Sequence, residues 1–236
     1  MDAQTQARLN DINRAFYATT AADFDQTRSR PWPGWLRLQP YVKAPLRVLD
    51  VGCGNGRFGL FLAEAHPAAV SYHGLDNSTE LLSFAEAALA QADFASYRLS
   101  EFDLLTQALP DASYDLVVLF GVIHHVPGAE QRQKLLRALA ARVATGGYLC
   151  FAAWCFYEYE RFRERLVSWP DDLVVEQHDY LLDWRAGEHA LRYCHYVDEA
   201  EHTALIAASG LQEVETFRED GSGRGMNRYS ILHNPT

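Results

Sequence analysis

The stretch Val48-Leu-Asp-Val-Gly-Cys-Gly-Asn-Gly56 decides the fold of this chain. Residues 47–51 form a short β-branched run that is typical of a strand, and residues 57–65 are expected to form a helix. Glycine is needed where the backbone turns through positive φ and where a ligand lies against the main chain. The stretch therefore predicts a strand, a ligand-binding turn and a helix.

Outward from this stretch, predicted strands and helices alternate along the chain. This spacing indicates crossover units, and so an α/β fold with a mostly parallel sheet and helices on both faces. A last helix over 199–209 precedes two strands, 211–217 and 226–233, that can pair antiparallel. The other strands are expected at 71–75, 94–99, 114–121 and 147–153, and the other helices at 3–18, 78–91 and 129–144.

Two segments lack this regularity. Residues 19–40 contain the breaker cluster Pro31-Trp-Pro-Gly34, and residues 155–197 are rich in Tyr, Trp, Arg and acids, as expected of a lid. We therefore predict one domain over 1–236. Its parts are an N-terminal helix and lid segment (1–44), a ligand-binding core (45–155), a lid insertion (156–197) and a C-terminal helix with a hairpin (198–236).

The amino-acid composition excludes several classes of protein. Of 236 residues 48% are hydrophobic, enough for a substantial core. The longest relevant apolar run, 116–123, is far shorter than the ~20 residues of a membrane-spanning helix. The polar N-terminus shows no secretory signal, and the four cysteines form no C-x-x-C pair. We expect a soluble, cytoplasmic protein without a metal site.

The charge balance bears on polyanion binding. The net charge of −10 argues against a nucleic-acid partner, because such proteins usually displace counterions with a basic surface. One segment has the opposite charge, since residues 27–49 carry five cations and no acid. That segment is either a solvated surface or a local anion-binding site.

Three acids near the glycine turn indicate the ligand. A dinucleotide site would read G-x-G-x-x-G, but here the spacing is G-x-G-x-G and Asp50 precedes it. A carboxylate there disfavours a pyrophosphate and favours a ligand with a cationic end. Asp76 ends the next strand, where it can accept both ribose hydroxyls. Asp103 could take the exocyclic amine of an adenine that lies between Phe102 and Leu104.

These features describe a nucleoside with a cationic aminoacyl tail, which is S-adenosylmethionine. Over about residues 45–155 the chain resembles the class I S-adenosylmethionine-dependent methyltransferases. The resemblance implies a Rossmann-like, seven-stranded sheet, S-adenosylhomocysteine as the product, and no metal. It also implies cofactor contacts from Asp50, Gly52, Cys53, Gly54, Asn55, Gly56, Asp76, Asn77, Phe102, Asp103, Leu104 and Phe120.

Segments outside this core resemble one family of that class, the tRNA wobble-uridine carboxymethyl methyltransferases. Residues 24–33 match its F-x-x-T-R-x-x-P-W-P pattern, and residues 122–125, 191–196 and 227–231 match further motifs. The chain departs from the family pattern at Asp183, where Pro is usual, and at Arg228, where Trp is usual. The resemblance implies 5-carboxymethyluridine in tRNA as the methyl acceptor and a small activator protein as a partner.

The candidate side chains outside the cofactor motifs are suited to a carboxylate as the methyl acceptor. With a pKa of ~4 it is ionised at neutral pH and needs no general base, only groups that orient it in line with the methyl carbon. Histidines could instead polarise or deprotonate an acceptor of higher pKa, and aromatic rings could stack on a base. The catalytic candidates are Arg28, Arg192, His195 and His125, and the substrate-binding candidates are Trp32, His124 and Tyr193, each with a structural contact as the alternative.

Two other functions stay open at this point. The acidic balance favours a methyltransferase for a small metabolite, with a carboxylic acid or another O or N acceptor. A non-catalytic cofactor-binding subunit is a third reading, which the intact glycines and acids make weak.

Overall fold

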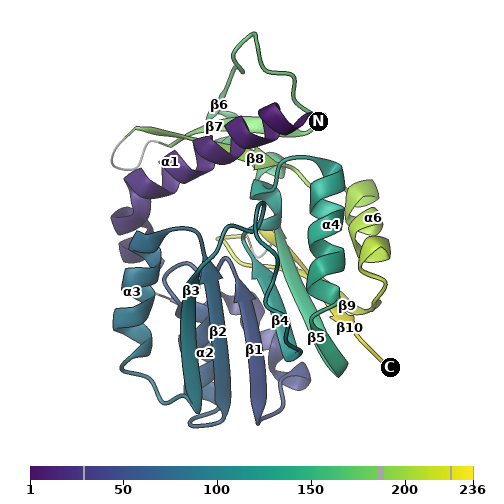
Figure 1. Cartoon of the computed structure of the whole chain (residues 1–236). Coiled ribbons are helices and arrows are strands. Elements are labelled where there is room, and N and C mark those ends of the chain that lie inside the picture. The colour runs from purple at the N-terminus through teal and green to yellow at the C-terminus, as the bar shows by residue number, and fades with distance from the viewer. Residues whose placement is uncertain (29, 185–188, 224, 236) are drawn as a thin grey trace.

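The computed structural model describes residues 1–28, 30–184, 189–223 and 225–235, and its centre is a seven-stranded sheet of order β3-β2-β1-β4-β5-β10-β9 (Figure 1). The first five strands in that order pair parallel, and β10 pairs antiparallel with β5 and β9. The strands are β1 (Leu46–Val51), β2 (Val70–Asp76), β3 (Ser96–Glu101), β4 (Tyr114–Phe120), β5 (Val143–Trp154), β9 (Gln212–Glu219) and β10 (Asn227–His233).

Helices cover both faces of this sheet. One core cluster joins the sheet to α4 (Ala129–Ala140) and α6 (Glu199–Ser209), and a second joins it to α2 (Arg57–Ala65) and η1 (Pro33–Tyr41). Helix α3 (Thr79–Leu89) is capped by the hydroxyl of Ser78. Since β1 lies between β2 and β4, the strand order reverses beside β1, and open α/β sheets bind ligands at such a point, beyond the strand ends.

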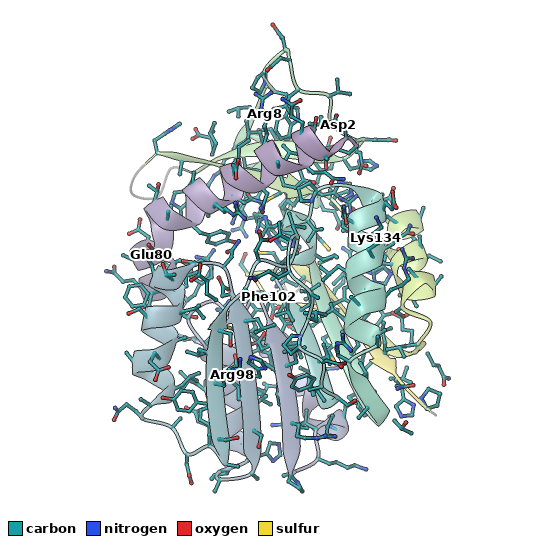
Figure 2. All side chains as sticks on the ribbon, in the orientation of Figure 1. Asp2, Arg8, Glu80, Arg98, Phe102 and Lys134 are labelled. Atoms are coloured by element: carbon teal, nitrogen blue, oxygen red, sulfur yellow. The ribbon has the colours of Figure 1, made fainter. Side chains whose placement is uncertain are left out.

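Helix α1 (Ala3–Thr27) lies above that end of the sheet (Figure 1). It packs against β8 (Ala190–His195), which forms a small antiparallel sheet with β6 (Leu166–Val167) and β7 (Asp179–Trp184). Short helices η2 (Ile123–His125), η3 (Phe156–Glu158) and α5 (Glu160–Arg163) complete the described elements. Figure 2 shows Phe102 inside the molecule, between the strand ends and α1. Helix α1 and the small sheet together cover the point beside β1 where the strand order reverses.

The predicted fold class is confirmed, but several boundaries differ from the prediction. The helix predicted over 129–144 ends at Ala140 and β5 begins at Val143, and residues 33–41, mostly within the segment expected to be irregular, form η1. Helix α1 continues nine residues past 18, because tertiary contacts hold this part: Phe24 packs edge-on against Tyr17, and the Asp25 carboxylate accepts a hydrogen bond from Asn55 Nδ2 (2.9 Å). Residues 155–197, expected to be irregular, contain the small sheet, whose strands β7 and β8 include no β-branched residue that would indicate a strand. Among the described helices, none is long and apolar enough to cross a membrane.

Candidate functional site

A cavity of about 400 Å³ lies at the reversal point, between the strand ends and α1. This volume falls in the range of about 300–1,000 Å³ that is typical of small-molecule sites. The glycine turn, the ends of β2 and β4, η2, α1 and the small sheet all contribute side chains to it. Segments far apart in the sequence therefore meet around one ligand-sized space.

The glycine turn forms the floor of this cavity. Gly52, Gly54 and Gly56 have φ of 75°, 56° and 77°, so all three positions need the left-handed conformation that favours glycine. A Cβ at position 52 would lie 2.2 Å from the side chain of Val122, which leaves no room for any other residue. The bare main chain is thus available to a ligand, as the spacing predicted.

Two of the three predicted acids face the cavity. Asp50 is 2% exposed, its carboxylate accepts a hydrogen bond from the Tyr72 hydroxyl at 2.6 Å, and burial raises its pKa to about 7. Asp76 accepts hydrogen bonds from the main-chain N–H groups of Gly54 (2.8 Å) and Ser78 (3.0 Å), and burial raises its pKa as well. A cationic ligand end beside Asp50 would return that carboxyl to its ionised form.

The third acid is placed differently from the prediction. Asp103 does not line the cavity, because its carboxylate pairs with Arg14 of α1 and accepts hydrogen bonds from Leu105 N (3.0 Å) and Thr106 Oγ1 (2.9 Å). Gly56 also lies outside the lining. The other predicted cofactor residues line the cavity, namely Gly52, Cys53, Gly54, Asn55, Asn77, Phe102, Leu104 and Phe120.

These residues fit S-adenosylmethionine. Asp76 stands at the end of β2 for ribose hydroxyls, and Phe102, Leu104 and Leu81 supply apolar surface for an adenine ring. Asp50 supplies negative charge beside the glycine turn. Asn55 is oriented by hydrogen bonds from its Nδ2 to Asp25 (2.9 Å) and to the carbonyl of Arg28 (3.3 Å), so the turn is tied to the end of α1.

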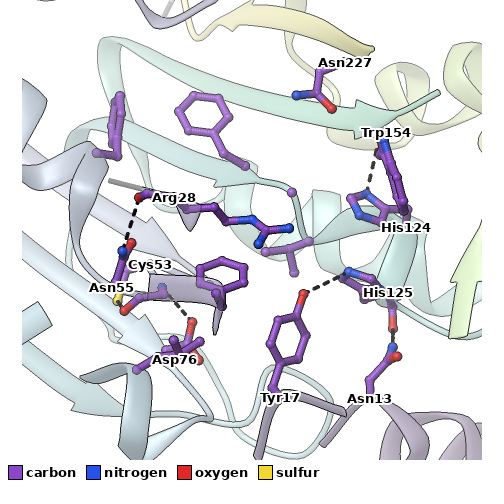
Figure 3. Close-up of a pocket in the computed structure, with 18 of the residues that line it drawn as sticks. Asn13, Tyr17, Arg28, Cys53, Asn55, Asp76, His124, His125, Trp154 and Asn227 are labelled. Atoms are coloured by element: carbon purple, nitrogen blue, oxygen red, sulfur yellow. Dashed lines mark hydrogen bonds between the residues drawn. The ribbon is translucent and has the colours of Figure 1, made fainter. Parts of the chain in front are cut away.

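Two arginines, Arg28 (Figure 3) and Arg192, bring positive charge to the cavity. The Arg28 guanidinium lies 4.2 Å from the ring centre of Phe24, and that of Arg192 lies 4.7 Å from Trp154 and 5.0 Å from Phe16. Burial and the second cation lower the pKa of Arg28. Among the described residues neither arginine forms an ion pair with an acid, so both charges are available to an anionic ligand.

Two predicted histidines line the cavity in the neutral form. Burial lowers the pKa of His124 well below its usual range, and burial with the nearby Arg192 lowers that of His125 to about 3. His124 Nδ1 accepts a hydrogen bond from the Trp154 main-chain N–H at 3.4 Å. Both rings are therefore unprotonated at neutral pH, and their lowered pKa values make them weak general bases.

Aromatic side chains surround the arginines. Trp32 lines the cavity, as predicted, and its ring is held by the guanidinium of Arg57 at 4.7 Å. Trp154, Trp184 and Phe162 form further parts of the lining. A planar acceptor group could pack between such faces.

His195 and Tyr193 do not line the cavity, which corrects their predicted contact with substrate. His195 is 2% exposed, and its ring nitrogens bond the carboxylates of Asp179 (2.8 Å) and Glu201. Burial opposes charging of His195, but these two carboxylates outweigh it and raise its pKa. The Tyr193 hydroxyl also donates to Asp179 (2.8 Å). Side chains of β8 alternate between the two faces of the small sheet, so Arg192 enters the cavity and its neighbour Tyr193 does not.

The same cluster could be taken for a metal site. Ligand atoms of Glu176, Asp179 and His195 lie within 4.8 Å of one another. However, the buried guanidinium of Arg132 pairs with Glu176 (3.2 Å) and Glu201 (2.6 Å), and it supplies the positive charge that a metal would bring. The cluster is best described as an ion-pair network that holds β8 against α4 and α6.

Sequence reasoning missed several polar residues at the cavity, among them Asn13, Tyr17 and Asp220. Asn13 and Tyr17 lie on its α1 side, and their spacing of four residues on a predicted helix was an available signal. Asp220, which is 4% exposed, accepts hydrogen bonds from Gly34 N (2.9 Å), Asn227 Nδ2 (2.8 Å) and Tyr229. Only the tertiary structure reveals that Asp220 joins η1 to β10.

Comparison with known proteins agrees with this geometry. A family model described as a methyltransferase domain matches residues 49–149. An Encephalitozoon cuniculi protein named as a methyltransferase is 29% identical over 209 residues, 88% of this chain and 90% of that one. Among solved structures, an N-methyltransferase (NodS) of Bradyrhizobium japonicum in complex with S-adenosylhomocysteine has a TM-score of 0.61 at 17% identity, covering 98% of this chain and 99% of that one.

Two further relatives have named acceptors. The tRNA (carboxymethyluridine(34)-5-O)-methyltransferase of Saccharomyces cerevisiae is 28% identical over 67% of this chain and 53% of its own length. The trans-aconitate 2-methyltransferase of Variovorax paradoxus is 36% identical over 59% of this chain and 48% of its own length. The chain therefore spans about half the length of each of these two relatives.

Proposed function

We propose that the chain is a class I S-adenosylmethionine-dependent methyltransferase, and that it transfers the methyl group to an acceptor carboxylate, that of 5-carboxymethyluridine in tRNA. The observation that carries the proposal is the pair of cavity arginines, Arg28 and Arg192, without a paired acid among the described residues. Guanidinium groups match carboxylates in charge and in fork geometry.

The neutral histidines support the same acceptor class. Bound S-adenosylmethionine supplies a methyl carbon made electrophilic by the sulfonium. An alcohol or amine acceptor would need a base that takes up its proton, and the lowered pKa values of His124 and His125 make both rings weak bases. A carboxylate arrives ionised, so the protein needs only to orient it and to exclude water. Arg28 and Arg192 would hold the carboxylate, and the surrounding aromatic rings would exclude water.

The relatives support a carboxylate without deciding which one. Both named acceptors, carboxymethyluridine and aconitate, carry this group. Trp32, Trp154 and Trp184 offer faces to a nucleobase, which favours the uridine. The net charge of −10 and the identity to the aconitate enzyme favour a free carboxylic acid as the second candidate. The activator protein that the resemblance implies stays a prediction.

Product chemistry tests this proposal. The protein would be incubated with methyl-labelled cofactor and, separately, with total tRNA from cells that lack wobble-uridine esters and with a metabolite extract. We expect label in tRNA that mild alkali releases, as an ester requires. Alkali-stable label would overturn the carboxylate acceptor, and alkali-labile label found only in the extract would replace tRNA by a small acid.

A further inference from the structure

The end of helix α1 is held against the glycine turn by one side chain of that turn. Asn55 lies between Gly54 and Gly56 and is 6% exposed. Its Nδ2 donates a hydrogen bond to the Asp25 carboxylate at 2.9 Å. It donates a second one to the main-chain carbonyl of Arg28 at 3.3 Å (Figure 3). A single buried amide therefore joins the glycine turn to two residues at the end of α1.

The chemistry of these two contacts matches an asparagine amide. A carboxylate and a main-chain carbonyl can only accept, so the Asn55 side chain must present its NH2 group to them. An aspartate in its place would add a third acceptor and no donor. Arg28 has φ −123° and ψ 47° and follows the last helical residue of α1, where main-chain carbonyls lack intrahelical partners. Asn55 thus supplies, from another segment, a hydrogen bond that the helix end cannot make.

The same end of α1 carries the guanidinium that would contact the acceptor. The Arg28 guanidinium lies 4.2 Å from the ring centre of Phe24 and donates to the Thr27 hydroxyl at 3.2 Å. The Phe24 ring in turn approaches the glycine turn, since its Cε1 atom would lie 3.5 Å from a Cβ at Gly54. Phe24, Arg28 and Gly54 all line the cavity. The place of the guanidinium relative to the glycine turn therefore depends on how the end of α1 is fixed to that turn.

We propose that Asn55 is a positioning residue for methyl transfer: its two N–H groups fix Arg28 relative to the glycine turn, and so fix the acceptor relative to the methyl donor. The inference rests on the proposed function in taking Arg28 as a group that holds the acceptor. In the transfer an acceptor oxygen forms a bond to the methyl carbon while the carbon–sulfur bond breaks and its electron pair stays on the sulfur. The reacting atoms must be in line, and a displacement of about 1 Å can lower the rate about 100-fold.

The test has one readout that needs no acceptor. In protein labelled with ¹³C at glycine and phenylalanine, nuclear Overhauser effects should connect the α-protons of Gly54 with the ring of Phe24, because the two groups are in contact. Asn55→Ala should lose these effects. The control Asn234→Ala removes an amide hydrogen bond to the Val143 carbonyl (2.9 Å), away from the cavity lining, and should keep them. Unchanged effects in Asn55→Ala would overturn the proposal whatever the acceptor is.

Kinetics with methyl-labelled cofactor supply the second readout, using total tRNA and 5-carboxymethyluridine as probes. Asn55→Ala should lower kcat about 10- to 100-fold, while the Kd of S-adenosylhomocysteine stays within about threefold of wild type. Asn234→Ala should not alter kcat. A wild-type kcat in Asn55→Ala, or a cofactor Kd weakened as much as kcat is lowered, would overturn the positioning role. Because all transferred label is counted, alkali-stable label would overturn the proposed acceptor and leave the role of Asn55 readable.

An exchange of partners separates positioning from a local disturbance of the glycine turn. Asn55→Asp sets a carboxylate against Asp25 with no donor between them, so kcat should fall at least as far as in Asn55→Ala. Adding Asp25→Asn supplies an amide that donates to the carboxylate at position 55 and should recover about tenfold in kcat. A double variant as slow as Asn55→Asp would overturn the proposal.

A second variant leaves the glycine turn itself intact. Asp25→Ala removes one of the two acceptors of the Asn55 amide, so it should weaken the Gly54–Phe24 effects and lower kcat in the same sense as Asn55→Ala. It carries the test if Asn55→Ala does not fold, and wild-type behaviour of Asp25→Ala would then overturn the proposal. If neither probe takes up label, the Gly54–Phe24 effects alone decide.

Discussion

Replacement of Asp50 by Asn should remove most of the pH dependence of cofactor binding. Burial raises the pKa of Asp50 to about 7, so at pH 5 only about 1% of the protein carries the ionised carboxylate. If the cationic cofactor requires that form, its Kd at pH 5 is about 100-fold weaker than its limiting value. Two pH units correspond to about 2 × 1.36, or 2.7 kcal/mol. The other cavity carboxyls, those of Asp76 and Asp220, are unchanged in this variant.

Isothermal titration calorimetry between pH 5 and 7.5 measures this effect. The range stops there because the α-amino group of the cofactor itself titrates near 8. We expect wild-type affinity to rise about tenfold per pH unit below 7, with proton release detected as a buffer-dependent enthalpy. Asp50→Asn should bind more weakly at pH 7.5 with a nearly flat profile, whereas Asp103→Asn, outside the cavity, should keep the wild-type profile. A flat wild-type profile, or equal slopes in wild type and Asp50→Asn, would refute the reasoning.

Four shorter predictions follow from the same contacts. Arg28→Gln and Arg192→Gln should keep the cofactor Kd within about threefold but lower acceptor kcat/KM about 100-fold, since each removes hydrogen bonds to a charged group. Normal turnover in both variants would contradict the proposal that these two arginines hold the acceptor carboxylate. The wild-type kcat should be flat from pH 6 to 9 because His125 stays neutral, and a limb near pH 6.5 would instead reveal a histidine base. In the ligand-free protein the pKa of Asp50 is raised from 3.8 to about 7, so its contribution to the free energy of unfolding is complete below pH 3.8 and is lost as the pH rises through 7. At pH 8 Asp50→Asn should therefore have a free energy of unfolding in urea higher than that of the wild type by on the order of 4 kcal/mol. A lower value for the variant would contradict this sign. Asp220→Asn should cost about 1–3 kcal/mol, since an amide cannot accept from all three buried donors, and an unchanged Tm would argue against this.

The parts of the site that lie near each other in sequence were predictable. The strand, glycine turn and helix over 47–65 depend on local backbone geometry, and Asp76 follows from the end of the next strand. Periodicity and glycine spacing report such features directly. The cofactor half of the cavity is therefore largely readable from the sequence.

The parts that depend on distant partners were not predictable. Asp103 turns from the cavity because Arg14, 89 residues away, pairs with it. His195 follows Arg192 by three residues on β8, so it faces the other side of the small sheet, but only the structure shows that this side holds an ion-pair network with Asp179 and Glu201. Tyr17 was missed because a helix pattern shows which residues share a face but does not show what that face covers.

The most direct test of the central claim compares one acceptor in two charge states. Wild-type protein with saturating labelled cofactor would be given 5-carboxymethyluridine and, separately, 5-carbamoylmethyluridine, which keeps the shape and removes the negative charge. We expect methyl transfer to the acid, with a methyl ester identified by mass spectrometry, and none to the amide. Methylation of both compounds at a ring or ribose atom would contradict the assignment of the arginine-lined cavity to a carboxylate.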